Sequence, residues 1–196
     1  MRILVACEYS GTVRDAFIKK GHDAMSCDIL PTEKPGPHYE GDIFDVLNDG
    51  WDMMIAHPPC TYLSNAAARF LYPQGKLNQE RYLKGMQAKE FFMKLLEAPI
   101  NKIAVENPVQ STVFGITKCT QYIQPYWFGD PFKKKTGLWL KNLPKLEPTD
   151  IVDNPKSTKT KKGQKSWFNQ GGKDRQKMRS RTFEGIANAM AEQWGH

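Results

Sequence analysis

The sequence predicts an α/β fold, built on a mostly parallel sheet covered by helices on both faces, with an antiparallel hairpin at one edge. In the first half, short apolar runs alternate with stretches whose apolar residues recur at helical spacing. After Pro125 two short runs follow each other without a helix between them, which is typical of paired strands. A chain of 196 residues has the length of one domain, so we expect a single domain over 1–196.

The parallel strands are predicted first, from short apolar runs that end at polar residues. They fall at 3–7, 23–29, 51–56 and 103–105. Apolar residues at helical spacing predict three helices, at 13–20, 78–97 and 183–194. The helix at 13–20 ends at Gly21, a natural C-cap. The hairpin strands are expected at 126–128 and 136–140.

The charge of the chain favours a polyanionic partner without identifying one. Lys and Arg number 28 against 21 Asp and Glu, which gives a net charge of +7 and a pI near 9.2. Such a balance is typical of nucleic-acid-binding proteins, although many basic proteins bind none. The 40% hydrophobic and 11% aromatic content is too high for a disordered chain. No run reaches the roughly 20 apolar residues of a membrane span, so an integral membrane protein is excluded.

Cysteine spacing and the N-terminus point to a reducing compartment. The four cysteines are far apart, and none forms a Cys-x-x-Cys pair; they are Cys7, Cys27, Cys60 and Cys119. This spacing excludes a zinc finger or ribbon, and we expect no bound metal. Residues 1–8 turn acidic too soon for the apolar core of a signal peptide. We therefore expect reduced thiols and a cytoplasmic location.

Polar or reactive residues stand at the ends of four predicted strands. They are Glu8 to Gly11, Asp28, Pro58 to Cys60, and Glu106 to Pro108. In an open α/β sheet, ligands bind beyond the carboxyl ends of the strands, near the point where strand order reverses. These four strand ends are therefore the candidate functional site.

Two of these strand ends resemble the DNA (cytosine carbon-5) methyltransferases, and the likeness spans most of the chain. Pro58-Pro59-Cys60 resembles that family's nucleophile loop, and Glu106-Asn107-Pro108 resembles its Glu-Asn-Val motif. The resemblance implies a Rossmann-like, S-adenosylmethionine-dependent methyltransferase fold acting on DNA. Cys60 would attack carbon 6 of cytosine as a thiolate, which turns carbon 5 into an enamine carbon able to accept a methyl group. Glu106 would supply a proton or a hydrogen bond at ring nitrogen 3.

The start of the chain resembles the cofactor loop of the same family. Tyr9-Ser10-Gly11 is similar to its Phe-x-Gly-x-Gly turn, but with one glycine and a shorter turn. Asp28 matches the acidic residue on the cofactor ribose, and Asp42 the one that reaches the adenine amino group; a capping role for Asp42 stays open. The resemblance implies the following S-adenosylmethionine-binding residues: Tyr9, Ser10, Gly11, Asp28, Asp42 and Pro58.

The chain differs from this family in the part that recognises the DNA sequence. Relatives insert a large recognition domain where this chain has only residues 142–177, much of it a lysine-rich loop at 154–174. Sequence specificity would then be loose, or come from a protein partner, unless the substrate is smaller than duplex DNA. Basic clusters with structured flanks are the expected nucleic-acid contacts: Lys133, Lys134, Lys135, Arg179 and Arg181.

Two other functions stay open at this point. Amino-group DNA methyltransferases carry Asn-Pro-Pro-Tyr or Asp-Pro-Pro-Tyr at the same strand end, and Tyr62 could supply the stacking ring. The alternative from another class is a catalytically silent methyltransferase fold that binds nucleic acid. The cysteine of His57-Pro58-Pro59-Cys60 favours carbon methylation through a flipped-out or single-stranded cytosine.

Overall fold

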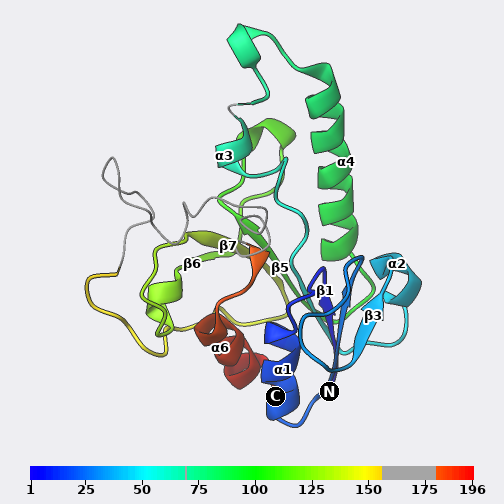
Figure 1. Cartoon of the computed structure of the whole chain (residues 1–196), viewed down its shortest axis with the longest axis vertical. Helices are drawn as coiled ribbons and strands as arrows, with labels where there is room; N and C mark the ends of the chain where they lie inside the picture. Colours follow the sequence, from blue (N-terminus) through cyan, green and yellow to red (C-terminus); the bar gives the residue numbers. More distant parts are fainter. Residues whose placement is uncertain (69, 156–179) are drawn as a thin grey trace.

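One sheet organises the described part of the protein, residues 1–68, 70–155 and 180–196 of a computed structural model (Figure 1). Its strands lie in the order β3-β2-β1-β4-β5-β7-β6. Their bounds are β1 (Arg2–Ala6), β2 (Asp23–Asp28), β3 (His38–Glu40), β4 (Met53–Ala56), β5 (Lys102–Pro108), β6 (Gln121–Ile123) and β7 (Thr136–Lys141). The five neighbouring strands β3-β2-β1-β4-β5 pair in parallel. Strand β7 pairs antiparallel with both β5 and β6. The Rossmann-like α/β fold with an antiparallel edge is therefore confirmed.

Helices cover both faces of the sheet. Helices α1 (Thr12–Lys19) and α6 (Glu184–Trp194) pack on the face that receives Ile3 and Val5. Helices α2 (Ile43–Val46) and α4 (Gln79–Leu96) pack on the other face, with Leu4 and Ala6. Because both faces are buried, the parallel strands are continuously apolar instead of alternating, which made them visible in the sequence.

The order of the strands defines where a ligand can bind. Strand β1 pairs with β2 on one side and β4 on the other, both in parallel. The chain runs outward from β1 to β3, then returns to start β4 on the opposite side of β1. Strand order thus reverses between β1 and β4, and the carboxyl ends of β2, β1, β4 and β5 lie along one edge.

The hairpin prediction was right about the antiparallel edge and wrong about one strand. Of the residues predicted as a strand at 126–128, Tyr126 and Trp127 belong to a 3-10 turn, η3 (Pro125–Trp127), and Phe128 forms only an isolated bridge with Asp150. The partner of β7 is β6. Pro125 has no N–H for a strand ladder, and the amide of Trp127 bonds back to the carbonyl of Gln124, 3.1 Å away. The tight turn therefore replaces the strand.

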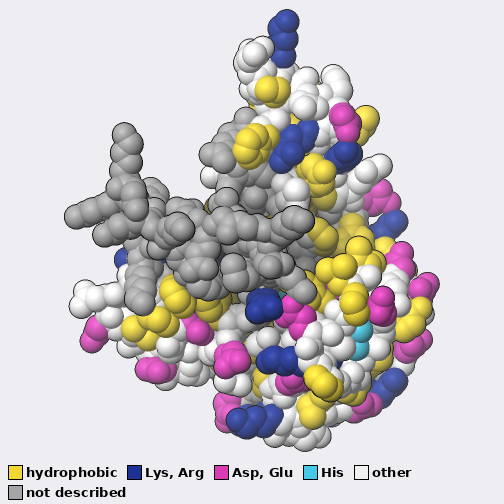
Figure 2. Space-filling view, viewed as in Figure 1, with side chains coloured by type: hydrophobic (Ala, Val, Ile, Leu, Met, Phe, Trp, Pro, Cys, Tyr) yellow, Lys and Arg dark blue, Asp and Glu magenta, His cyan; other side chains and the backbone are white. Residues whose placement is uncertain are grey.

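Helix α4 projects beyond the sheet together with the short helices α3 (Asn65–Ala68) and η1 (Pro73–Gly75) (Figure 1). Exposed apolar side chains occur along this projection (Figure 2): Phe70, Tyr72, Leu77, Leu83 and Met86. A further 3-10 turn, η2 (Thr112–Phe114), packs against α4 through Phe114. Within the described ranges, no helix combines the length and apolar composition needed to cross a bilayer.

Candidate functional site

The turn from β1 into α1 is stabilised by a buried carboxylate. Glu8 is 4% exposed, and its two oxygens accept the backbone N–H groups of Val13 at 2.7 Å and Arg14 at 3.2 Å. The hydroxyl of Ser10 donates to the same carboxylate at 3.1 Å. These N–H groups belong to the first turn of a helix, where anions usually bind. Because the protein's own carboxylate occupies that position, the structure disfavours a pyrophosphate there.

Asp28 and Asp42 lie near each other beyond β1 and β2. Asp28 is half-buried and accepts the backbone N–H of Leu30 at 3.0 Å; burial raises its pKa. Asp42 is the N-cap of α2 and accepts the N–H of Phe44 at 3.1 Å, which is the capping role that the sequence left open. Burial raises the pKa of Cys7, and Asp28, the Cys27 thiol and Asp42 raise it further. Both carboxylates therefore face the end of β1.

The predicted nucleophile loop directly follows β4. Residues 57–60 have no regular secondary structure; Pro58 is buried, and Cys60 is partly exposed. The backbone carbonyl of Cys60 accepts the N–H of Ser64 at 3.2 Å. In contrast, Cys27 is fully buried, and burial raises its pKa to about 12, so its thiol stays protonated. Of these two thiols, only that of Cys60 can be reached from solvent.

Glu106 and His57 meet between the adjacent strands β5 and β4. The Nδ1 atom of His57 lies 3.5 Å from Oε2 of Glu106, and the two side chains are 6% and 19% exposed. Burial alone would raise the pKa of Glu106, but the hydrogen bond from His57 and the positive charge of Lys134 outweigh it. The pKa of Glu106 therefore lies below its ordinary value, and the side chain is a carboxylate at neutral pH.

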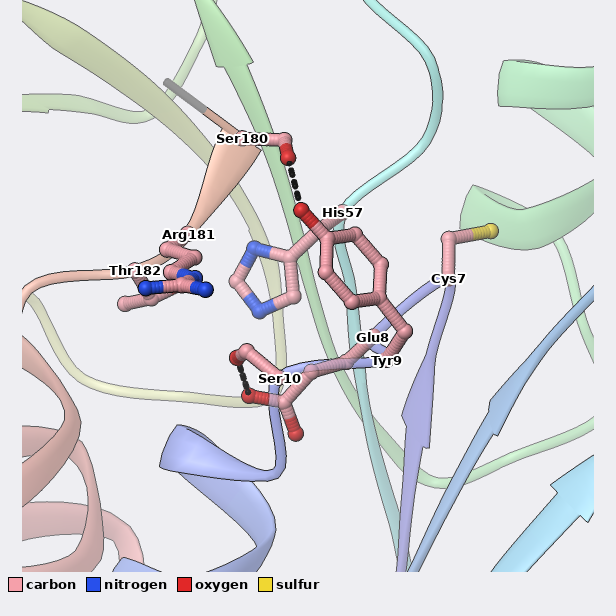
Figure 3. Close-up of a pocket in the computed structure, with 8 residues that line it drawn as sticks. All are labelled: Cys7, Glu8, Tyr9, Ser10, His57, Ser180, Arg181 and Thr182. Carbon is pink, nitrogen blue, oxygen red and sulfur yellow. Dashed lines mark hydrogen bonds between the residues drawn. The ribbon is translucent and has the colours of Figure 1, made fainter. Parts of the chain in front are cut away.

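Two neighbouring hollows open at this edge of the sheet. The first is lined by the end of β1, His57 and the segment before α6 (Figure 3). The second is lined by Glu106, Lys134 and residues at the start of α6. His57 and Thr182 line both. The two hollows therefore adjoin each other and form one recess, lined by both charged and apolar side chains.

The structure brings together some of the predicted site residues and not others. Tyr9, Ser10 and Arg181 line the first hollow, and Glu106 and Lys134 line the second. The remaining predicted residues line neither; those described are Gly11, Asp28, Asp42, Pro58, Cys60, Lys133 and Lys135. Arg179 and nearly all of the lysine-rich loop at 154–174 lie outside the described residues.

Sequence reasoning named Arg181 as a basic contact but did not predict that Ser180 and Thr182, in the same segment before α6, line the recess. The hydroxyls of Tyr9 and Ser180 lie 2.7 Å apart, although 171 residues separate them (Figure 3). Arg181 pairs with Glu33 at 2.7 Å, which raises its pKa and offsets part of the charge expected to contact DNA. No local pattern marks such a contact in a sequence, because tertiary packing creates it.

Two further basic residues of the predicted DNA contact, Lys134 and Lys135, lie near aromatic rings. The ammonium group of Lys134 is 5.8 Å from the centre of the Phe183 ring, and that of Lys135 is 4.0 Å from the Tyr122 ring.

Across the described ranges, no group of three His, Cys, Asp or Glu side chains is arranged to hold a metal ion.

Comparison with known proteins gives a likeness of fold. No family model matches the chain, and no curated protein is similar enough to count as a relative. A solved structure with a similar fold is a candidate DNA modification methyltransferase encoded within a prophage of E. coli. The identity is 13% and the TM-score 0.48, and the match covers 78% of this chain and 52% of the other. The chain thus spans about half the length of that protein, and a likeness at this level has no bearing on activity.

Proposed function

We propose that the protein is an S-adenosylmethionine-dependent DNA methyltransferase that acts at carbon 5 of cytosine. One observation carries the proposal. The four strand ends that resemble the family's motifs belong to the adjacent parallel strands β2, β1, β4 and β5, so they share one edge across the switch point. Residues far apart in the sequence, from Asp28 to Glu106, thereby come to the same edge of the sheet, which supports the proposal.

The residues near Asp28 fit the cofactor. Its partly buried carboxylate accepts the backbone N–H groups of Leu30 and Ile29, and the remaining lone pairs of its two oxygens can accept the two hydroxyls of a ribose. Ile29 directly follows it and is 78% exposed, which offers apolar surface to a purine ring. The carboxylate of Glu8 at the start of α1 disfavours a dinucleotide pyrophosphate, but leaves room for a cofactor without phosphate. When bound, S-adenosylmethionine would supply the methyl group.

The chain's own residues would carry the rest of the reaction. The Cys60 thiolate forms a bond to carbon 6, and the displaced electron pair makes carbon 5 nucleophilic. Because Glu106 is ionised at neutral pH, we assign it the acceptance of a hydrogen bond from the cytosine amino group instead of proton donation. After methyl transfer, the proton on carbon 5 leaves, the double bond between carbons 5 and 6 reforms, and sulfur departs as thiolate.

The amino-group reaction has less support in the geometry. It needs an aromatic face beside the Pro-Pro turn, and Tyr62 is the ring near that position. The guanidinium of Arg81 lies 5.1 Å from the centre of this ring. Arg81 thus occupies one face of the ring, and a base would have to displace this cation or stack on the opposite face, whereas the thiol of Cys60 is partly exposed.

A covalent trap tests the proposal. DNA that contains 5-fluorocytosine should form a lasting adduct with the protein in the presence of S-adenosylmethionine, because fluorine cannot leave carbon 5 as a proton does. Mass spectrometry should locate the adduct at Cys60. The Cys60→Ala variant should form none while its cofactor affinity stays within a few-fold of wild type. Cys119→Ala, which removes a buried thiol on the loop before β6, is the matched control and should be trapped like wild type.

Two results would contradict the carbon-5 mechanism. One is an adduct that persists in Cys60→Ala, and the other is wild-type protein that methylates DNA without being trapped. A silent nucleic-acid-binding protein would be recognised by DNA binding without methyl transfer and without measurable affinity for S-adenosylmethionine in calorimetry.

A further inference from the structure

The imidazole of His57 presents a buried nitrogen without a partner. Its side chain is 6% exposed, and Nδ1 faces the Glu106 carboxylate at 3.5 Å. Nε2 has no hydrogen-bond partner among the described residues. Buried polar atoms are satisfied in the great majority of cases, so an exception beside a hollow indicates a group that binds there.

The contact with Glu106 determines what Nε2 can do. A carboxylate only accepts hydrogen bonds, so Nδ1 of His57 carries the hydrogen. In the neutral ring this leaves a lone pair on Nε2, the form that accepts a proton. A carboxylate behind an imidazole also stabilises the cation that forms when the ring is protonated. The 3.5 Å contact is long, but catalytic hydrogen bonds often tighten only when substrate is bound.

His57 lies between the two hollows of the recess. It lines both hollows, and it is three residues before Cys60, beyond the end of the same strand. In Figure 3 its ring lies among the side chains of Tyr9, Ser10 and Arg181. Charged groups that line the recess around the ring come from the β1 end, β5, the loop before β7 and the segment before α6; they are Glu8, Glu106, Lys134 and Arg181. Two carboxylates and two cations leave the ring in surroundings of balanced charge.

We propose that His57 is a further catalytic residue, whose Nε2 accepts the proton that leaves carbon 5 of cytosine after methyl transfer. This proposal rests on the proposed function. In this step the bond between carbon 5 and hydrogen breaks, and its electron pair forms the double bond to carbon 6. The bond between carbon 6 and the sulfur of Cys60 breaks, and sulfur leaves as thiolate. The proton resides on His57, whose charge Glu106 stabilises until solvent removes it.

The His57→Asn variant separates this role from a structural one. An asparagine amide can donate to Glu106 much as Nδ1–H does, but it cannot accept a proton at neutral pH. Trapping on 5-fluorocytosine DNA needs attack and methyl transfer only, so we expect its rate to stay within about 3-fold of wild type. Turnover on ordinary cytosine should fall roughly 100-fold or more, the usual effect of a lost general base. A methylated covalent adduct should then accumulate on ordinary DNA, and tritium release from carbon 5 should slow by the same factor as turnover.

The other possible results contradict either the role of His57 or the proposed function. Unchanged turnover in His57→Asn means that another group takes the proton. Equal losses of trapping and turnover, in a variant whose thermal unfolding matches wild type, mean that His57 only positions Glu106. His57→Gln serves the same comparison if His57→Asn does not fold. Wild-type protein that is not trapped at all overturns the proposed function itself, whatever the His57 variants do.

Discussion

Asp28 is the residue on which the proposed cofactor site most depends, because its carboxylate is the expected acceptor for the ribose hydroxyls. We predict that Asp28→Ala weakens S-adenosylmethionine binding and leaves DNA binding unchanged. Hydrogen bonds to a charged group contribute about 1.5–3 kcal/mol each before desolvation is counted, so affinity should fall at least about tenfold. Calorimetric titration measures the loss, with the exposed Asp153→Ala as control.

The pKa of Asp28 adds a pH dependence with a definite sign. Burial raises that pKa, so as pH falls the carboxylate is protonated earlier than an ordinary aspartate. Cofactor affinity of the wild type should therefore decline in mild acid, whereas Asp28→Ala should lack this component. Superimposable titrations of the two proteins would show that the cofactor does not lie along β2.

The Glu106→Gln variant tests whether the carboxylate of Glu106 binds the cytosine ring. We predict that Glu106→Gln slows methyl transfer roughly 100-fold or more, because the amide cannot replace the charge. The pKa of Glu106 is lowered, so its contribution to folding stability is complete above the ordinary pKa of glutamate and is lost as pH falls through the lowered value. The difference in unfolding free energy between wild type and Glu106→Gln should shrink over that acidic range. The exposed Glu97→Gln is the matched control.

The outcome that contradicts this assignment is a Glu106→Gln variant with full activity. A stability difference that grows in acid would contradict the sign of the pKa shift. Both measurements are needed, since a slower enzyme alone could reflect a displaced His57.

Sequence motifs predicted some of the residues at this edge of the sheet and gave no signal for others. The positions of Cys60 and Glu106 near the carboxyl ends of β4 and β5 could be predicted because strand-end motifs are read along the chain. His57 stood inside one of those motifs, but its contact with Glu106 and its unpartnered nitrogen exist only once β4 and β5 are paired. Thr182 carried no signal, since packing of α6 alone brings it to the recess.

At the scale of elements, Arg14 links helix α1 to the loop that connects β2 and β3. It is fully buried, and its guanidinium donates to the hydroxyls of Ser26 and Thr32, each at 3.2 Å. It also donates to the backbone carbonyls of Lys34 and Pro35, at 3.1 and 3.3 Å. Gly11 and Gly36 allow this close packing, since a Cβ at either would lie 2.4 or 2.7 Å from the guanidinium. The arginine thus holds the loop that follows Asp28.

We predict that Arg14→Ala lowers the unfolding free energy by at least about 3 kcal/mol, because it removes several charged hydrogen bonds and leaves buried acceptors unsatisfied. Arg14→Lys should recover only part of the loss, since one ammonium group cannot reach every acceptor of a planar guanidinium. Urea unfolding measures both, with the exposed Lys19→Ala on the same helix as control. Equal midpoints for Arg14→Ala and Lys19→Ala would show that the loop does not depend on this arginine.

The elements themselves were predictable where they are long or fully buried. Helix α4 was predicted at 78–97 and is Gln79–Leu96, because its apolar residues recur at helical spacing over a long run without proline; its buried large apolar residues, Phe92 and Leu95, lie in its second half. Strand β3 and helix α2 were missed: at three and four residues they are too short for any periodicity, and pairing with β2 and the Asp42 cap define them. Strand β5 extends to Pro108 because β7 pairs with its end, an arrangement that no local run of residues could predict.

At the scale of the whole molecule, the net charge of +7 is not explained by the described recess. Arg181 and Lys134 line the recess together with the acidic Glu8 and Glu106. On the face drawn in Figure 2, described basic and acidic side chains are interspersed, without one continuous basic surface. Much of the excess charge belongs to the lysine-rich loop at 154–174, nearly all of which lies outside the described residues.

We therefore predict that this loop binds DNA phosphates, which gives affinity without reading sequence. Five of its lysines should be changed to glutamine together: Lys156, Lys159, Lys161, Lys162 and Lys165. For each phosphate that the protein no longer neutralises, the slope of log affinity against log salt should become shallower by about 0.9 on duplex DNA. The variant should thus bind every DNA sequence more weakly, with a slope flatter by several units, as measured by fluorescence anisotropy over a salt series.

A control variant lowers the net charge equally at exposed lysines elsewhere, namely Lys19, Lys76, Lys94, Lys118 and Lys145. If both variants flatten the slope alike, overall charge is responsible. If neither does, DNA binds elsewhere on the protein, with Lys133 to Lys135 the next residues to test.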